Sequence, residues 1–210
     1  MEALLDIENY IQAVASAEPV PGGGSVAGVV ASLGAALGSM VTNFTVGKKK
    51  YAEHQKKAEE TLHNLNDQIR KLMDLAQKDI NTYATVSKAY ALPKETKEDK
   101  KNRVAAIESA SEIALKVPFE IMKVSSKVSD TLKSLSLYGN ANLDSDMAGS
   151  ALLIQAASET SFFCVYANLP FIKDMDKVNS IKKSINEMRA RVNSDCQEIV
   201  ATVSKRMNIS

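Results

Sequence analysis

Residues 19–47 read PVPGGGSVAGVVASLGAALGSMVTNFTVG, a run of 29 residues without a charged side chain. The run opens with a loop rich in proline and glycine, and Ser25 can cap a helix over residues 25–46. Because that helix is uncharged all round, we expect other helices to enclose it. Another backbone, from a neighbouring helix or a second subunit, can pack closely against its small residues, which are Gly28, Ala31, Gly34, Ala35 and Gly38. Such residues gain little from transfer into lipid, so the run predicts a buried central helix rather than a membrane span.

Helical periodicity continues beyond this run. Residues 50–91 place apolar side chains at alternating steps of three and four, the spacing of a packed helix–helix interface. Further helices are expected over residues 3–16, 97–137, 146–168 and 175–207. Pro118 is expected to break or kink its helix, and residues 139–146 form a polar loop. With no strand alternation, the sequence predicts an all-α fold, an elongated helical bundle in one domain over residues 1–210.

The first and last of these helices have distinct patterns. In residues 3–16 one side of the helix is apolar and consists of Leu4, Ile7, Ile11 and Val14. Residues 175–207 carry charges of both signs, which is typical of an outer helix.

Composition excludes several classes of function. Lys and Arg number 26 against 25 Asp and Glu, which argues against a nucleic-acid partner. Cys164 and Cys196, the two cysteines, have neither disulfide-framework nor zinc-site spacing, so a reducing, cytoplasmic setting fits best. The N-terminus lacks the basic-then-apolar order of a signal peptide. His54 and His63 are nine residues apart and do not share a helix face, so no metal site is expected.

Three acids stand out by position. Asp79 occupies a seam position where an apolar side chain is expected, so its carboxyl group is either bonded to a neighbouring helix or a catalytic acid/base. Glu159 is the one charged residue between Met147 and Ile172, and is either a satisfied structural pair or a site residue. Asp146 begins a helix, where capping is the simpler explanation.

Two further segments could bind anions. The turn made by Gly22, Gly23, Gly24 and Ser25 opens a helix, so its free backbone N–H groups could hold a carboxylate or phosphate. Its loose match to a dinucleotide-binding fingerprint is weak, because no strand precedes it. Lys48 and Lys49 either begin a solvated helix or bind an anionic ligand tail.

Several stretches, in order and spacing over nearly the whole chain, resemble the cyclodeaminase family. That family includes the cyclodeaminase half of bifunctional formiminotransferase-cyclodeaminase and stand-alone bacterial methenyltetrahydrofolate cyclohydrolases. The matching stretches are 19–27 running on to 47–51, 79–83 with 92–96, 139–140 with 145–146, and 159–160 with Asn168.

The resemblance implies a homodimer with the folate site in a groove between subunits. It implies that Asp79 is the catalytic acid/base. It also implies that Asp146 is a site residue, not only a helix cap, and that it orients or assists in catalysis. For substrate binding, the expected residues are Gly22, Gly23, Gly24, Ser25, Lys48, Lys49, Asn140, Glu159 and Asn168.

The activity implied is that of a cytoplasmic ammonia-lyase, a formiminotetrahydrofolate cyclodeaminase. It closes 5-formiminotetrahydrofolate to 5,10-methenyltetrahydrofolate and releases ammonia. The folate substrate can carry a polyglutamate tail, and neither a metal nor another cofactor is needed. One alternative is 5,10-methenyltetrahydrofolate cyclohydrolase, which uses the same acid/base pocket. The other is a non-catalytic helical protein that binds an anion or a partner, with its buried acids in structural roles.

Overall fold

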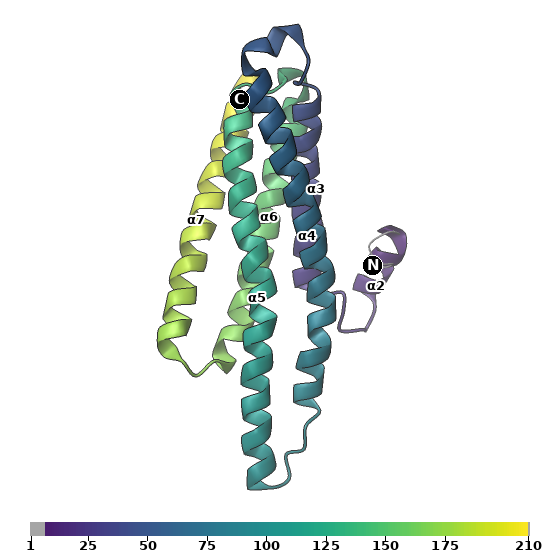
Figure 1. The fold of residues 1–210 in the computed structure, drawn as a ribbon, viewed down its shortest axis with the longest axis vertical. Helices are drawn as coiled ribbons and strands as arrows, with labels where there is room; N and C mark the ends of the chain where they lie inside the picture. The colour runs from purple at the N-terminus through teal and green to yellow at the C-terminus, as the bar shows by residue number, and fades with distance from the viewer. Residues whose placement is uncertain (1–6, 210) are drawn as a thin grey trace.

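The computed structural model describes residues 7–209, which form an elongated helical bundle (Figure 1). Its helices are α2 (Ile7–Ala15), α3 (Gly23–Asn43), α4 (Gln55–Tyr90), α5 (Lys97–Ser136), α6 (Asp144–Asn168) and α7 (Met175–Arg206). Short 3-10 helices cover Lys49–His54, Ala141–Leu143 and Leu169–Phe171. The described residues contain no strand, so the predicted all-α fold is confirmed. Residues 3–6 of the first predicted helix, including Leu4, lie outside the described residues.

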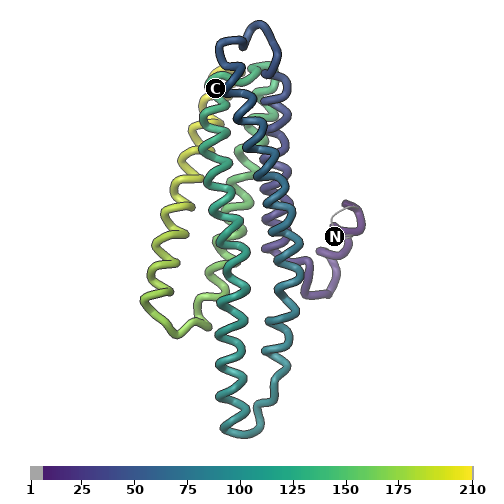
Figure 2. The backbone as a smooth tube through the Cα atoms, viewed as in Figure 1, coloured from purple at the N-terminus to yellow at the C-terminus, as the bar shows by residue number. Residues whose placement is uncertain are grey.

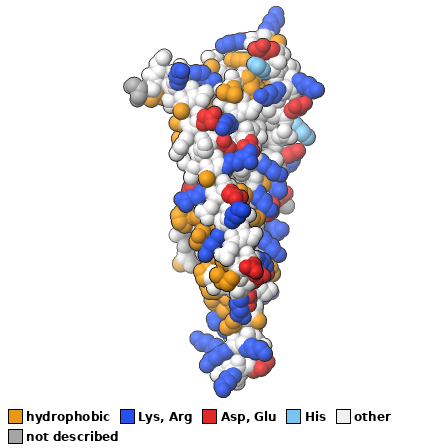
Figure 3. Space-filling model, turned by 90° about the vertical axis from the view of Figure 1, so that its left-hand side faces the viewer, with side chains coloured by type: hydrophobic (Ala, Val, Ile, Leu, Met, Phe, Trp, Pro, Cys, Tyr) orange, Lys and Arg blue, Asp and Glu red, His pale blue; other side chains and the backbone are white. Residues whose placement is uncertain are grey.

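The long helices run antiparallel to their neighbours along the chain (Figure 2). α3 packs against α4 and α6, and α5 packs against all three. α7 packs mainly against α5 and α6, as expected for an outer helix. Figure 3, which faces the α7 side, shows charges of both signs spread along the molecule. The α4–α5 hairpin reaches past the other helices, and α2 is set off from the bundle on the side of α3 (Figure 1).

Small residues let α3 approach its neighbours. A Cβ atom at Gly28 would lie 2.8 Å from the Ala76 Cβ on α4, and one at Gly34 would lie 3.0 Å from the Ile154 Cγ1 on α6. These positions therefore serve contacts within the chain, not contacts with a second subunit. α3 is apolar and long enough to span a membrane by length and composition, and most of it is buried in the bundle.

The expectation that α3 is enclosed on every side is wrong. Leu33 on α3 and Phe44, the C-cap of α3, are 46% and 51% exposed, and Leu152 and Phe163 on α6 are 53% and 63% exposed. α3 has helices on two sides and behind it, and no described element covers its outer side. We call these four residues and the uncharged surface between them the α3–α6 face.

α5 continues through Pro118 as one helix, so the predicted break does not occur. Pro118 has no N–H, so the carbonyl group of Ala114 lacks its usual helical donor. Both neighbouring turns are buried between α4 and α6, and this packing holds the helix together across the missing bond. At its start, α5 has a capping box formed by Thr96 and Asp99.

The predicted seam of α4 is buried over its first half, where Ala58, Leu65, Leu72 and Ala76 are all fully enclosed. Farther along, α4 extends beyond α3 and packs mainly against α5. Tyr90 there is 44% exposed, and its ring lies edge-on to that of Phe171. A small cluster that includes Ala89 and Ile107 is the apolar core of this extension. Lys and Arg side chains gather at its tip (Figure 3).

Candidate active site

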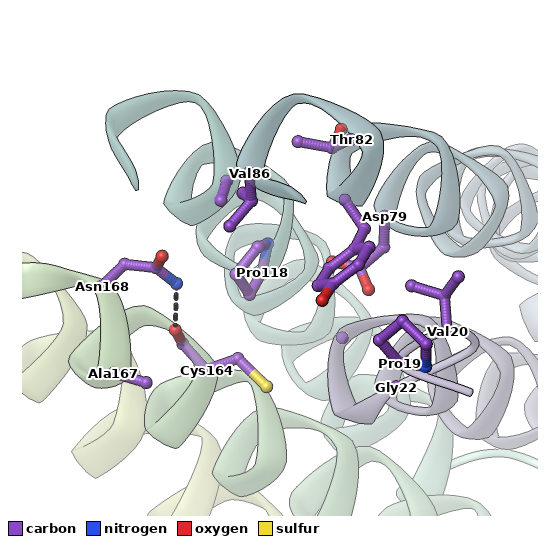
Figure 4. Close-up of a pocket in the computed structure, with 13 residues that line it drawn as sticks. Pro19, Val20, Gly22, Asp79, Thr82, Val86, Pro118, Cys164, Ala167 and Asn168 are labelled. Atoms are coloured by element: carbon purple, nitrogen blue, oxygen red, sulfur yellow. Dashed lines mark hydrogen bonds between the residues drawn. The ribbon is translucent and has the colours of Figure 1, made fainter. Parts of the chain in front are cut away.

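A cavity of about 240 Å³ lies where the N-terminus of α3 meets α4, α5 and α6 (Figure 4). Its walls are mainly apolar and include Pro19, Val20, Val86, Ala114, Pro118 and Ala167. The carboxyl group of Asp79 is the one charged group among the residues that line it. A partly buried carboxyl group in a mainly apolar cavity is the arrangement expected of an acid/base residue.

Asp79 extends from α4 to the first turn of α3. Its carboxylate accepts a hydrogen bond from the backbone N–H of Ser25. Burial raises the pKa of Asp79 above its usual value, and the bond from Ser25 offsets part of this shift. The N-terminal N–H group that could have bound a ligand anion thus binds a carboxylate of the chain itself.

The glycine turn gives this carboxylate its space. α3 begins at Gly23 with Gly22 as its N-cap, and no side chain caps the helix from that position. This differs from the prediction that Ser25 is the cap, because Asp79 of another helix takes up a free N–H instead. A Cβ atom on Gly24 would lie 2.6 Å from Cγ and 2.7 Å from Oδ2 of Asp79. Gly24 therefore makes room for the acid.

Ser25 is fully buried, and its hydroxyl group faces away from the cavity. Its Oγ atom lies 3.0 Å from the hydroxyl oxygen of Tyr10 on α2. Burial raises the pKa of Tyr10, and the nearby charge of Asp79 raises it further. Sequence reasoning missed Tyr10, which lies at the edge of the apolar side of its helix, three residues after Ile7 and four before Val14. A tyrosine there was the available signal.

Cys164 and Asn168 close the cavity on the α6 side (Figure 4). The Cys164 thiol is free, and a Cβ atom on Gly23 would lie 3.2 Å from its Sγ. Burial and the charge of Asp79 raise the pKa of Cys164 to about 11, so the thiol is protonated at neutral pH. The Asn168 amide donates to the Cys164 carbonyl oxygen at 2.9 Å. Asn168 was expected from the resemblance, whereas no sequence pattern marked Cys164.

Four of the expected residues lie at the other end of the bundle. Asn140 donates its backbone N–H to the Thr45 hydroxyl at 3.0 Å, close to Lys48 and Lys49. Gly24 and Thr45 are 21 positions apart, which is about 30 Å at 1.5 Å per residue. Asp146 and Cys164 are separated by about 27 Å along α6 on the same basis. Within one chain, therefore, neither Asp146 nor the lysines lie beside Asp79.

Glu159 faces α7 rather than the cavity. Its carboxylate accepts hydrogen bonds from Nε of Arg189 at 2.8 and 2.9 Å, and from the Asn193 amide at 2.9 Å. These bonds, chiefly the one from Arg189, lower the pKa of Glu159 below its usual value. This is the structural-pair arrangement considered for Glu159 above. Among residues 7–209, no three His, Cys, Asp or Glu side chains are grouped as metal ligands.

Comparisons with known proteins identify relatives over most of the chain. The formiminotransferase-cyclodeaminase family model matches residues 6–187. A methenyltetrahydrofolate cyclohydrolase of Methylorubrum extorquens is 32% identical over 96% of this chain and 97% of its own. The formimidoyltransferase-cyclodeaminase of Gallus gallus is 28% identical over 94% of this chain, which spans only 36% of that longer protein.

A solved structure extends the match to three dimensions. The crystal structure of formiminotetrahydrofolate cyclodeaminase from Thermotoga maritima superposes with a TM-score of 0.88. The superposition covers 99% of this chain and 100% of that one, at 28% identity. The resemblance that the sequence motifs indicated is confirmed, and the chain belongs to the formiminotransferase-cyclodeaminase family.

Proposed function

We propose that this protein is a formiminotetrahydrofolate cyclodeaminase, an ammonia-lyase that converts 5-formiminotetrahydrofolate to 5,10-methenyltetrahydrofolate. The observation that carries the proposal is one carboxyl group, Asp79, held with a raised pKa in an apolar cavity. A pKa closer to the working pH lets one group both accept and donate a proton. The full-length match to the Thermotoga maritima cyclodeaminase supports the same activity.

In the proposed step, N10 of the folate attacks the formimino carbon and a new C–N bond forms. Asp79 accepts the proton that N10 loses and passes it to the formimino nitrogen. A second proton from solvent completes ammonia as the old C–N bond breaks, which leaves the methenyl cation. The reaction is intramolecular, so the protein contributes conformation and proton transfer, and the step uses neither a metal nor a redox cofactor.

The size of the cavity limits what it can enclose. Pockets that enclose a whole drug-sized ligand measure about 300–1,000 Å³. The cavity of about 240 Å³ would therefore hold the reacting end of the folate and leave the glutamate tail outside. Lys48 and Lys49 lie too far away to bind that tail within the same chain.

A homodimer resolves this separation. The α3–α6 face is apolar and exposed, and an antiparallel copy packed on it would bring the end of one chain that contains Lys48, Lys49, Asn140 and Asp146 towards the Asp79 cavity of the other chain. The folate would then lie in a groove between subunits. We propose this assembly, in which Asp146 assists Asp79 across the interface.

The second candidate is 5,10-methenyltetrahydrofolate cyclohydrolase. It is favoured by the full-length match to the Methylorubrum extorquens protein of that name. In that reaction Asp79 would activate a water molecule that opens the ring. The apolar walls of the cavity favour the cyclodeaminase, in which no water reacts.

The deciding experiment supplies purified protein with each folate. Release of ammonia from 5-formiminotetrahydrofolate, together with a rise in methenyl absorbance, supports the cyclodeaminase. Loss of methenyl absorbance from 5,10-methenyltetrahydrofolate, faster than without protein, supports the cyclohydrolase. Activity on neither folate would overturn both assignments.

A further inference from the structure

No described element of the chain covers the apolar side of α2. Ile7 and Ile11 are 62% and 60% exposed, and Val14 is 37% exposed. Tyr10 is the one buried residue of this helix. The apolar side predicted from the sequence thus faces solvent, while Tyr10, at the edge of that side, contacts the bundle.

Among the described residues, α2 is attached to the bundle mainly through Tyr10, its one buried residue. The bond between Tyr10 and Ser25 connects it to the first turn of α3. Figures 1 and 2 show α2 extending away from the bundle on the side of α3.

We propose that α2 is a docking arm: its Ile7, Ile11 and Val14 side packs against a second copy of this chain, and this docking keeps Tyr10 beside Ser25 at the Asp79 site. The effect on the site rests on the proposed function. The docking itself does not.

The area of the α3–α6 face favours a second copy as the partner. α3 has 21 residues and is about 30 Å long, and two packed helices present a width of roughly 20 Å. The resulting area of roughly 600 Å² is somewhat below the ~800 Å² per partner of a standard interface. An arm that reaches over the partner adds the missing apolar area.

The distribution of charge also favours a second copy of the chain as the partner. Residues 19–47 carry no charge, so two copies of this face can meet without repulsion. Helices that lie on membranes are typically rich in Lys and Arg on their polar side. α2 has none, and Glu8 is its one charged residue, so an anionic lipid surface is a poor partner.

Tyr10 connects the arm to the site by two bonds in series. Its hydroxyl group lies 3.0 Å from Ser25 Oγ, and the Ser25 backbone N–H donates to Asp79. Undocking of α2 would break the first bond and open the end of α3 to water. Tyr10 is therefore a positioning residue, because it acts through Ser25.

The test uses Ile11→Glu, with Gln12→Glu as the matched control on the opposite, exposed side of α2. In sedimentation over a concentration series, Ile11→Glu should raise the dimer dissociation constant at least tenfold, and Gln12→Glu should leave it within about twofold of wild type. In the wild-type protein, hydrogen exchange of the α2 amides should slow as the dimer population rises. This second measurement needs no variant to fold.

Tyr10→Phe tests the connection to the site. It should keep the dimer but lower turnover about fivefold, the loss expected of one hydrogen bond, and move the acid limb of the pH–rate profile. Unchanged turnover and profile in this variant would overturn the positioning role.

Other results would overturn the docking. These are a wild-type monomer at all concentrations, a wild-type-like dissociation constant for Ile11→Glu, or exchange of α2 independent of concentration. Binding of the arm to phosphatidylglycerol vesicles in place of self-association would also overturn it. Absence of folate turnover in the wild-type protein would remove the proposed function, while the sedimentation and exchange results would still decide the docking.

Discussion

Asp79 stands in place of an apolar residue in the seam of α4, and burial raises its pKa. If it is the acid/base, Asp79→Asn should lower turnover by about 10²–10⁴-fold, because the amide cannot exchange a proton. Asp74→Asn, an exposed change on the same helix, should leave turnover unchanged. Steady-state kinetics would measure both, and near-normal turnover in Asp79→Asn would remove Asp79 from the mechanism.

The raised pKa of Asp79 also makes the stability of the protein depend on pH. Between the usual pKa of Asp and the raised one, the folded protein binds more protons than the unfolded chain, so its unfolding free energy falls as pH rises through that window. The same variant, Asp79→Asn, should therefore be more stable than wild type at neutral pH. In acid the difference should vanish, which denaturant titrations at several pH values would show.

Gly24 offers a second residue-scale test, because a side chain there would occupy the space of the Asp79 carboxyl group. Gly24→Ala should displace that group from the Ser25 N–H and lower turnover at least tenfold. In the control, Gly149→Ala, the new Cβ would lie an ordinary 3.4 Å from Leu37. That change should keep turnover and raise the unfolding free energy by up to about 1 kcal/mol. Equal turnover in both variants would contradict this account of Gly24.

A substitution at Glu159 can distinguish a structural role of this residue from a role in substrate binding. Its pair with Arg189 is partly exposed, so Glu159→Gln should lower the unfolding free energy by about 1 kcal/mol. Because its side chain faces α7, KM for the folate should stay within about twofold of wild type. Glu187→Gln, an exposed change on α7, is the control for stability. A large rise in KM with stability unchanged would return Glu159 to the substrate site.

Individual residues were predictable where they broke a pattern. Asp79 stood out because an acid replaced an apolar seam residue, and the structure places it in a cavity. Cys164 broke no pattern, and Tyr10 gave only the weak signal of a tyrosine beside an apolar side. Both come close to Asp79 only through packing between helices. The catalytic and binding roles of all these residues stay predictions.

Among the helices, α5 shows most clearly how packing overrides a local rule. Pro118→Ala should supply the missing N–H to the Ala114 carbonyl oxygen. A proline inside a helix costs about 3 kcal/mol relative to alanine, and loss of two buried CH₂ groups offsets roughly 1.6 kcal/mol of that. We therefore expect a net gain of about 1 kcal/mol in unfolding free energy, measured by denaturant titration. A loss would mean that the proline ring contributes more to packing than the helix gains.

The other helices show what periodicity can and cannot predict. Their existence and approximate bounds followed from apolar spacing, since each long helix buries one stripe. Periodicity could not say which stripe meets which helix. The outer side of α3 was expected to be covered, and no partner was predicted for the apolar side of α2. Among the described residues both are exposed.

For the whole molecule, an all-helical bundle followed from the sequence because five long amphipathic or apolar segments leave few other ways to bury their faces. The distance between the two ends of the site did not follow. Asp79 lies on α4 and Asp146 on α6, so their distance cannot be counted along one helix. The lengths of α3 and α6 show that the two acids are nearly 30 Å apart. The placement of site residues at both ends is understandable if the working unit contains two chains.

The projecting α4–α5 hairpin makes the molecule vulnerable to cleavage at one place. Residues 91–98 are exposed and join the helices beyond the main core, and Lys94 offers trypsin a site there. Brief digestion should nick the chain near this turn, giving two fragments that separate on a denaturing gel. They should stay together in gel filtration, because α4 and α5 remain packed in the bundle below the cut. Early cleavage elsewhere, or dissociation after the nick, would show that the tip contributes more to cohesion than its small apolar cluster suggests.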